Sequence, residues 1–216
     1  MKKFLFLLLV SISICLTANA YEDAETGLVF SISNGNATIL NSSGTTDAVT
    51  TNYTESIIVI PKTVTDKDDP SVTGTVTAIG AYAFYNCKTM EEITLPSTLT
   101  TIGVEAFRNT NNLRKVHIAS IESYLGISMD KEYASPTRVG VNNVIGLYID
   151  DQLITDLVIP EGITETKAYS FAGNSSLKSV KLPSTLKTIN DFSFFGCTNI
   201  ESVDLANVET IKQYAF

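Results

Sequence analysis

A repeat of about 23 residues constrains the fold of this chain more than any other feature of its sequence. Phe84 and Phe107 lie 23 residues apart, as do Phe171 and Phe194, and Phe216 follows after another 22 residues. A period of this length matches neither a helix nor a strand and is typical of one supersecondary unit. Such a unit is too small to bury its own apolar face, so neighbouring units must stack to form a continuous core. The sequence therefore predicts a repeat solenoid.

Other apolar residues recur at fixed distances from these phenylalanines. Isoleucine stands five residues before the phenylalanine in four coils, at Ile79, Ile102, Ile189 and Ile211. Nine and eleven residues after the phenylalanine stand apolar residues separated by one position, namely Ile93 and Leu95, Val116 and Ile118, Val180 and Leu182, and Val203 and Leu205. Alternation over so short a run predicts a strand. Proline follows at Pro96 and Pro183 and cannot continue it, because proline lacks the amide N–H. We therefore expect a mainly β fold with one short parallel strand per coil.

The phrase LPSTL occurs twice, at residues 95–99 and 182–186, and the two copies are 87 residues apart. This distance corresponds to three coils and 18 extra residues, which places an insert at about residues 121–154. Within the insert, IESYLGI predicts a short helix, and LYIDDQLIT predicts a hairpin that turns at Asp150-Asp151. The intervening DKEYASPTRVGVNN is expected to be an exposed loop, which can serve as a binding element or as a spacer.

Residues 1–20 have the features of a secretory signal peptide. Two lysines precede a short apolar run, and the segment ends in Ala-Asn-Ala, a small-x-small cleavage site. We therefore expect export and a mature chain that begins at Tyr21, has no transmembrane segment and is secreted or displayed at the cell surface. A lipid anchor at Cys15 is the alternative, although the preceding Ile14 is larger than the residue usual at that place.

The segment 21–56 is expected to form an N-terminal β cap. GLVFSISNGNATIL alternates around Asn34-Gly35, a dipeptide favoured in two-residue hairpin turns. A cap is expected because the end of a solenoid exposes apolar core. The repeats then occupy residues 57–216. The last coil is incomplete at Phe216, which favours a longer native protein or a truncated reading frame.

Charge and motif content argue against several classes of function. The chain has 15 basic and 23 acidic residues, and loss of the two lysines of the signal peptide would change the net charge from −8 to −10. Such a chain repels the phosphates of nucleic acids. The sequence contains no phosphate-binding loop, no His-Glu-x-x-His and no Gly-x-Ser-x-Gly motif. We therefore expect no enzyme activity, no small-molecule substrate and no cofactor.

Two further groups of residues could suggest chemistry, and a structural role is expected for both. Asp66, Asp68 and Asp69 lack the glycine and the distal glutamate of an EF-hand calcium loop, so a turn is expected there. Cys87 and Cys197 recur at one repeat position. We expect them to be free, small apolar residues of the core and not metal ligands.

The repeats resemble BspA-type leucine-rich repeats, which occur in surface antigens of host-associated bacteria. The stretches MEEITLPSTLTTIGVEAFRNT and LKSVKLPSTLKTINDFSFFGC are similar to that family's phrase L-x-x-V-x-L-P-x-x-L-x-x-I-x-x-x-A-F-x-x-C. The resemblance covers about residues 57–216. Departures are Thr166 in place of isoleucine, and Thr110 and Asn174 in place of cysteine.

The resemblance implies a secreted or cell-surface leucine-rich repeat protein that acts as a non-catalytic module for macromolecular interaction or adhesion. Its partners would be host or microbial surface proteins or glycans. The alternative is a structural spacer, or a targeting module of a longer chain with a domain beyond residue 216. Sequence beyond residue 216 would distinguish these hypotheses. Further repeats followed by a surface anchor would favour the interaction module, and catalytic motifs would favour the targeting module.

Outward-facing strand positions are the residues expected to meet a partner. They form two rows across successive coils, Glu92, Lys115, Asp156, Ser179 and Ser202 in the first, and Thr94, His117, Val158, Lys181 and Asp204 in the second. Neighbouring coils stack about 5 Å apart, so Glu92 can pair with Lys115. The candidate partner-binding face comprises Glu92, Thr94, Lys115, His117, Asp156, Val158, Lys181 and Asp204. The alternative is an ordinary solvated sheet face. His117 is the single histidine and has no matched nucleophile, so it does not indicate catalysis.

Overall fold

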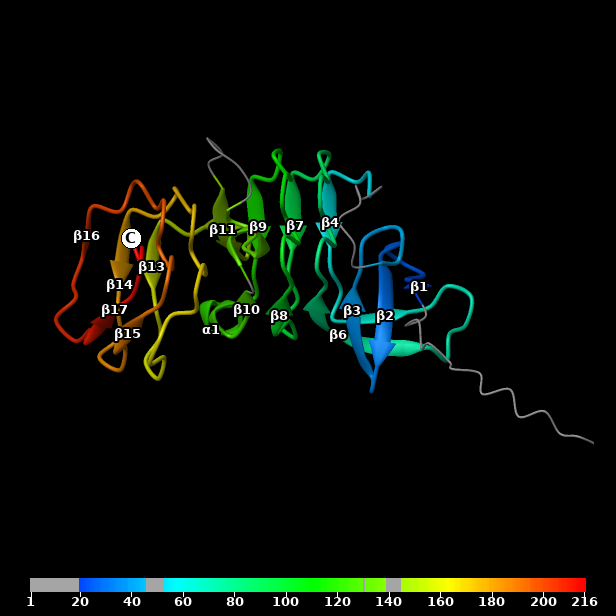
Figure 1. The fold of residues 1–216 in the computed structure, drawn as a ribbon, viewed down its shortest axis with the longest axis horizontal. Coiled ribbons are helices and arrows are strands. Elements are labelled where there is room, and N and C mark those ends of the chain that lie inside the picture. The colour runs from blue at the N-terminus through cyan, green and yellow to red at the C-terminus, as the bar shows by residue number, and fades with distance from the viewer. Residues whose placement is uncertain (1–19, 46–52, 130, 139–144) are drawn as a thin grey trace, which may run out of the picture.

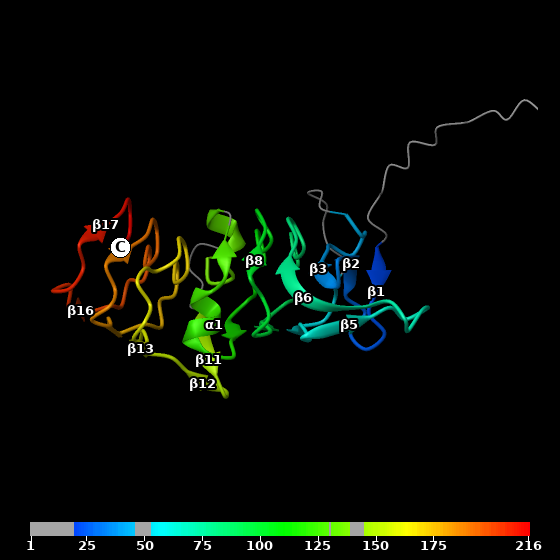
Figure 2. The same ribbon diagram turned by 90° about the horizontal axis from the view of Figure 1, so that it is seen from below.

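The computed structural model describes residues 20–45, 53–129, 131–138 and 145–216. The coils stack side by side along the long axis of the molecule, and the N-terminal strands and the last coil lie at opposite ends (Figure 1, and Figure 2 after a 90° turn). The described residues form short strands, one α-helix (α1, Ile121–Leu125) and one 3-10 helix (η1, Glu132–Ala134). None of these helices is long and apolar enough to cross a membrane. The prediction of a strand-rich repeat fold is confirmed.

One side of the solenoid carries two sheets, and we call their outward side the strand face. A five-stranded sheet has the order β12-β11-β9-β7-β4. Its members are β4 (Ile57–Val59), β7 (Glu92–Thr94), β9 (Lys115–His117), β11 (Gly146–Ile149) and β12 (Gln152–Leu153). A three-stranded sheet, in the order β13-β14-β16, consists of β13 (Asp156–Val158), β14 (Ser179–Lys181) and β16 (Ser202–Val203).

A second set of strands runs along another side of the coils. It has the order β1-β2-β3-β6-β8-β10, with β5 also paired to β6. These strands are β1 (Tyr21–Glu22), β2 (Val29–Ser33), β3 (Asn36–Ile39), β5 (Thr63–Thr65), β6 (Thr73–Ile79), β8 (Thr101–Ile102) and β10 (Ser128–Met129). Farther along, β15 (Thr188–Ile189) pairs with β17 (Thr210–Ile211).

The pairing register follows the sequence repeat. β7 and β9 are parallel and place Glu92 opposite Lys115. β13 and β14 are parallel and place Asp156 opposite Ser179. In both pairs the partners are 23 residues apart. Side chains at one repeat position therefore stand next to each other in space on successive coils.

The repeat phenylalanines lie at the centre of the core. Phe84, Phe107, Phe171 and Phe194 are all buried. Phe84 stacks on Phe107 with 5.3 Å between ring centroids, and Phe171 stacks on Phe194 at 5.2 Å. One buried aromatic side chain removes on the order of 150–250 Å² of surface from water. The stacked rings therefore join neighbouring coils within each half of the solenoid through apolar contact.

The N-terminal residues form the hairpin that the sequence predicts. β2 and β3 are antiparallel, and the φ angles of 52° at Asn34 and 76° at Gly35 suit a two-residue turn. β3 then pairs in parallel with β6. The buried carboxylate of Asp23 accepts hydrogen bonds from the backbone N–H groups of Thr26 and Thr65, which ties β1 to β5. The hairpin is thus continuous with the second set of strands.

The insert forms strands in both sets. α1 begins after Ser120, whose hydroxyl accepts a hydrogen bond from the N–H of Ser123. β10 then pairs in parallel with β8, and β11 pairs in parallel with β9. β11 and β12 form an antiparallel hairpin with φ angles of 48° at Asp150 and 60° at Asp151. The predicted short helix and the predicted hairpin are both confirmed.

The prediction of an exposed loop at DKEYASPTRVGVNN is wrong for part of this segment, which is buried. Ala134 and Thr137 are buried, and the hydroxyl of Thr137 donates to the carbonyl oxygen of Ala172 at 2.8 Å. The reason is that this segment packs on the following coil. The loop residues 130 and 139–144 lie outside the described residues.

Tyr124 of α1 joins the insert to the following coil. Its buried ring contacts that of Phe171, with 5.9 Å between centroids, and its hydroxyl donates to the carbonyl oxygen of Ser170 at 2.7 Å. Among the described residues, no strand pairing links β11 or β12 with β13. Side-chain packing therefore connects the two halves of the solenoid at this junction.

Candidate partner-binding face

The strand face of the first half carries a cluster of charged and aromatic side chains. Glu92 of β7 accepts a hydrogen bond from Lys115 Nζ at 2.6 Å through one carboxylate oxygen, and its other oxygen lies 3.2 Å from His117 Nε2. The ring of His117 stacks on that of Tyr148, with 5.3 Å between centroids and 29° between planes. Nδ1 of His117 lies 3.4 Å from the carboxylate of Asp151. We call these five residues the strand-face cluster.

Strand register explains why these side chains meet. β7, β9 and β11 are neighbouring parallel strands of one sheet, with Glu92 opposite Lys115 and His117 opposite Tyr148. Alternation along each strand turns Val116, between the two β9 residues, into the core. The same alternation therefore aligns the outward side chains of three coils.

Glu92 is the electrostatic centre of the cluster. Its hydrogen bond from Lys115 is the main cause that holds the pKa of the Glu92 carboxyl below its usual value, and His117 adds to this effect. The same hydrogen bond raises the pKa of Lys115. Both groups therefore stay ionised over a wide pH range. Ion pairs that face solvent contribute about 0–1 kcal/mol, so the pair orients side chains more than it stabilises the fold.

The insert changes the two rows that the sequence predicts. β11 places Gly146 beside Lys115 and Tyr148 beside His117, so Asp156 does not follow Lys115 directly. The predicted order of neighbours is wrong at this point, because the insert was not recognised as contributing a strand to the row. Leu147 pairs with Val116, but the two residues are 31 positions apart instead of 23, so the repeat period does not place Tyr148 on this face.

Of the remaining predicted residues, Thr94 lies on β7, and the other four lie on or directly beside the sheet of the second half. Asp156, Val158 and Lys181 are exposed on β13 and β14, and exposed Asp204 directly follows β16. The carboxylate of Asp156 accepts a hydrogen bond from the Ser179 hydroxyl at 2.6 Å, which is the main cause of its lowered pKa. These four residues and the strand-face cluster therefore belong to two separate sheets.

Exposed apolar side chains flank the strand-face cluster. Ile57 and Val59 of β4 are 57% and 53% exposed. In register, Ile57 lies opposite Glu92 and Val59 opposite Thr94. Interfaces combine an apolar centre with a polar surround. This sheet thus offers apolar, charged and aromatic groups on one continuous surface.

A second surface feature, at the turns between strands, was not predicted from the sequence; Tyr169 and Phe192 are partly exposed there, and Tyr214 is exposed. Tyr169, Phe192 and Tyr214 each stand two residues before a repeat phenylalanine. The rings of Tyr169 and Phe192 stack with 4.9 Å between centroids, and the ring of Tyr214 is tilted against that of Phe192 at 5.0 Å. Their φ angles of 61°, 56° and 51° fall in a region that large side chains rarely occupy. We call this row the turn edge. The recurrence of an aromatic residue at one repeat position was its visible signal.

The thiols are not placed for chemistry. Cys87 and Cys197 are both free. Burial raises the pKa of both thiols, that of Cys197 to about 12. Sγ of Cys197 donates to the carbonyl oxygen of Phe171 at 3.0 Å. A thiol that remains protonated is a poor nucleophile and a poor metal ligand, which supports a role in packing.

The aspartates between β5 and β6 form the predicted turn. The carboxylate of Asp66 accepts a hydrogen bond from the N–H of Asp69 at 3.2 Å, and Asp69 accepts one from the N–H of Ser71 at 3.0 Å. Across the part of the chain that the structure describes, no three His, Cys, Asp or Glu side chains are placed to hold a metal ion. The acidic run therefore acts through local turn geometry.

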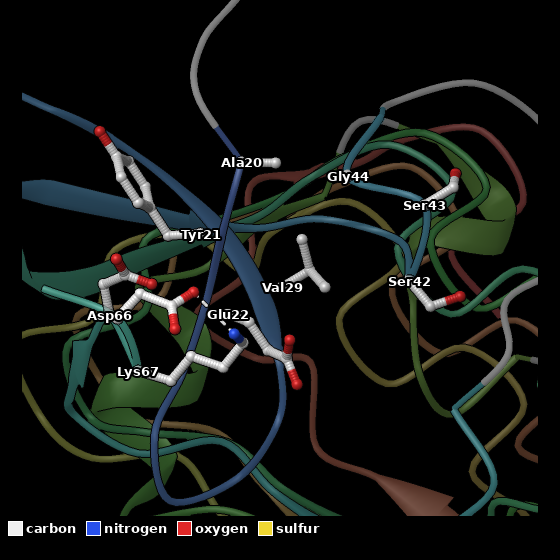
Figure 3. Close-up of a pocket in the computed structure, with 10 residues that line it drawn as sticks. Ala20, Tyr21, Glu22, Val29, Ser42, Ser43, Gly44, Asp66 and Lys67 are labelled. Carbon is white, nitrogen blue, oxygen red and sulfur yellow. Dashed lines mark hydrogen bonds and ion pairs between the residues drawn. The ribbon is translucent and has the colours of Figure 1, made fainter.

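An open hollow of about 370 Å³ lies at the N-terminal end, between β1, the chain after β3 and the turn that follows β5 (Figure 3). Tyr21, Glu22, Ser43 and Lys67 are among its lining residues. Nζ of Lys67 donates to the Asp68 carboxylate at 2.6 Å, so the ammonium is paired within the wall. The lining includes no histidine or cysteine, and the serines there therefore lack an adjacent imidazole base.

The outward orientation of the predicted face can be tested by stability. Replacing Lys115, His117 and Lys181 together with alanine is expected to change the free energy of unfolding by about 1 kcal/mol or less, because solvent-facing charges contribute little. Urea denaturation of the native and triple-variant proteins measures this difference. A loss of several kcal/mol would show that these side chains belong to the core.

Comparison with known proteins places the chain among leucine-rich repeats. Residues 68–130 and 148–216 match the family described as BspA type leucine rich repeat region, in six copies. No curated protein matches the chain.

A solved structure with a TM-score above 0.5 shares this fold. A leucine rich cell surface protein from Faecalibacterium prausnitzii is 23% identical with a TM-score of 0.54, and the match covers 92% of this chain and 52% of that one. A leucine-rich repeat protein from Bacteroides ovatus is 24% identical with a TM-score of 0.49, and the match covers 88% of this chain and 49% of that one. The chain thus spans about half the length of these structures.

Proposed function

The chain belongs to the BspA-type leucine-rich repeat family, and from this premise we propose that it is an exported, non-catalytic module that binds a macromolecular partner through its strand face. The partner would be a protein or glycan on a host or microbial surface. The strand-face cluster is the observation that carries this proposal. It presents a tyrosine, an imidazole, an ammonium and a carboxylate from adjacent strands of one sheet, and a second carboxylate from the turn after β11.

The chemistry of this surface suits recognition more than catalysis. Tyrosine is enriched among the residues that dominate binding energy, because it buries a large area at a small entropy cost. Carboxylates and ammonium groups supply hydrogen bonds that fix orientation. Within the described part of the chain, no serine or cysteine is recorded against the ring nitrogens of His117, which face carboxylates. The exposed apolar residues of β4 would extend the contact area.

The proposed division into signal peptide, cap and solenoid is consistent with an exported interaction module. We propose that residues 1–20 are a signal peptide, although they lie outside the described residues, and that residues 21–56 cap the solenoid of residues 57–216. The hairpin of β2 and β3 supports the cap, because it continues the strand set beyond the first coil. An exported interaction module needs such protection, since an open solenoid end exposes apolar core.

A binding screen with matched variants tests the proposed function. The purified protein would be applied to an array of extracellular-matrix proteins and glycans, together with the double variant Lys115→Ala/Tyr148→Ala. The control is Lys187→Ala/Tyr214→Ala, which removes the same residue types away from the strand face. We expect the native and control proteins to bind, and the strand-face variant to lose affinity by at least about tenfold, as for one hot-spot residue.

Two outcomes would contradict this function. Absence of binding across the array by protein whose circular dichroism shows an intact fold would argue against an adhesion module. Equal binding by the strand-face variant would argue against the strand face as its site.

A second candidate function is supported by chain length. The match to the Faecalibacterium prausnitzii structure covers only 52% of that structure, which is consistent with repeats that act as a spacer or targeting module within a longer protein. A spacer needs no partner on its strand face. In that case neither variant would change attachment of the full-length protein to cells.

A further inference from the structure

The β11–β12 hairpin reaches across the strand face to the single histidine of the chain. The carboxylate of Asp151 lies 3.4 Å from His117 Nδ1, and its side chain is 91% exposed. Asp150 and Asp151 form the two-residue turn, both with positive φ angles. Hydrogen-bonded register places Tyr148 opposite Leu153 just below this turn. The turn therefore lies beside the sheet, and its exposed Asp151 side chain contacts His117.

His117 faces a carboxylate at each ring nitrogen. Nε2 lies 3.2 Å from Glu92, and Nδ1 lies 3.4 Å from Asp151. A neutral imidazole has one N–H, so its other nitrogen would direct a lone pair at a negatively charged oxygen. The imidazolium form has two N–H groups and satisfies both contacts. Both contacts can therefore persist only when His117 is protonated.

The two contacts differ in how firmly their carboxylates are held. Glu92 lies on a central strand and accepts a hydrogen bond from Lys115 at 2.6 Å. Asp151 lies at the tip of a turn and is almost fully exposed. The charged or titratable groups that face His117 are thus Glu92 from β7, Lys115 from its own strand, and Tyr148 and Asp151 from the hairpin. Of these, Asp151 is the group free to move away.

We propose that His117 is a pH-sensitive latch that holds the β11–β12 turn against the strand-face cluster when protonated and releases it when neutral. Imidazole is the side chain that ordinarily changes charge between about pH 5 and 8. The latch rests on the proposed function for its biological meaning, because it would regulate the partner-binding face. Deprotonation changes Lys115, His117, Glu92 and Asp151 from a neutral set to one with a net negative charge, and it loosens the turn beside Tyr148.

The expected effect is modest. An exposed ion pair shifts the ratio of closed to open turn by up to about fivefold. A population change of this size is visible in NMR chemical shifts. Because the chain has one histidine, its imidazole signals belong to His117.

The test is an NMR titration between pH 5 and 8 of the native protein and two matched variants. Asp151→Asn removes the charge and keeps a residue that tolerates positive φ, and Asp150→Asn makes the same change at the neighbouring turn position. We expect the amide signals of Asp151 and Gln152 to move with the same midpoint as the His117 ring, in the native protein and in Asp150→Asn. The amplitude should fall at least fourfold in Asp151→Asn. Carboxyl groups ordinarily titrate near pH 4, below this range.

The latch is overturned if the turn amides do not follow the ring in the native protein, or if both variants respond alike. This result is independent of partner binding. Array binding without a coupled titration would overturn the latch and leave the proposed function standing. A coupled titration without array binding would support the latch and contradict the proposed function.

Discussion

Replacing Phe171 with alanine is expected to lower the free energy of unfolding by about 3–5 kcal/mol, the usual cost of deleting a fully buried aromatic ring. Phe171 is buried between two other rings, with centroid distances of 5.2 Å to Phe194 and 5.9 Å to Tyr124. It lies where side-chain packing, and not strand pairing, joins the insert to the following coil. The cavity would therefore weaken the junction between the two halves.

The matched control is Phe216→Ala at the same repeat position. Phe216 is 48% exposed and stacks on Phe194 alone, so its removal should cost clearly less. Guanidinium denaturation followed by circular dichroism measures both values. Equal losses for the two variants would mean that the buried aromatic row does not dominate the core.

The second large effect is expected from Gly173→Ala. Gly173 has a φ of +79°, and an added Cβ would lie 2.5 Å from the carbonyl oxygen of Thr137. The left-handed backbone costs an alanine about 1–2 kcal/mol, and overpacking against a neighbouring backbone adds about 1–3 kcal/mol. We therefore expect a total loss of about 2–5 kcal/mol in the free energy of unfolding.

Gly162→Ala separates these two causes. Gly162 has a φ of +92°, and nothing lies within 4 Å of the added Cβ. This variant should lose only the backbone contribution of about 1–2 kcal/mol. Thermal or chemical denaturation of the two variants gives the difference. Equal costs would contradict the close packing of the insert on the coil that contains Gly173.

The parts of the fold that could be predicted from the sequence are those set by local period. The in-step apolar residues predicted that Phe107 and Phe194 are buried and that Glu92 pairs with Lys115. Short-range turn chemistry predicted the hairpins at Asn34-Gly35 and Asp150-Asp151. In each case the interacting residues lie within one coil or one repeat of each other, so a single period determines their phase.

Contacts made by the irregular insert could not be predicted in this way. β11 pairs with β9 at a separation that does not equal the repeat, so Tyr148 was not assigned to the strand face. Tyr124 reaches Ser170 across 46 residues. Such contacts depend on how the insert folds back, and no periodic signal records that. The contact between His117 and Asp151 was missed for the same reason, although the hairpin itself was expected.

The turn edge was not predicted from the sequence for a different reason. Aromatic residues at one repeat position were visible in the sequence, but their positive φ angles and stacked rings follow from the turn geometry. Apolar periodicity indicates which residues recur and does not distinguish buried from exposed aromatic positions. Phe194 is buried, whereas Tyr214, two residues before the next repeat phenylalanine, is 57% exposed.

Hydrogen exchange of the protein bound to a partner from the array tests the central claim most directly. If the strand face is the binding site, backbone amides of β7, β9 and β11 should exchange more slowly in the complex, and those of the β11–β12 turn should change with them. Amides of β15 and β17 should be unaffected. Protection confined to the turn edge around Tyr169 and Tyr214, with none on β7, β9 and β11, would contradict the account.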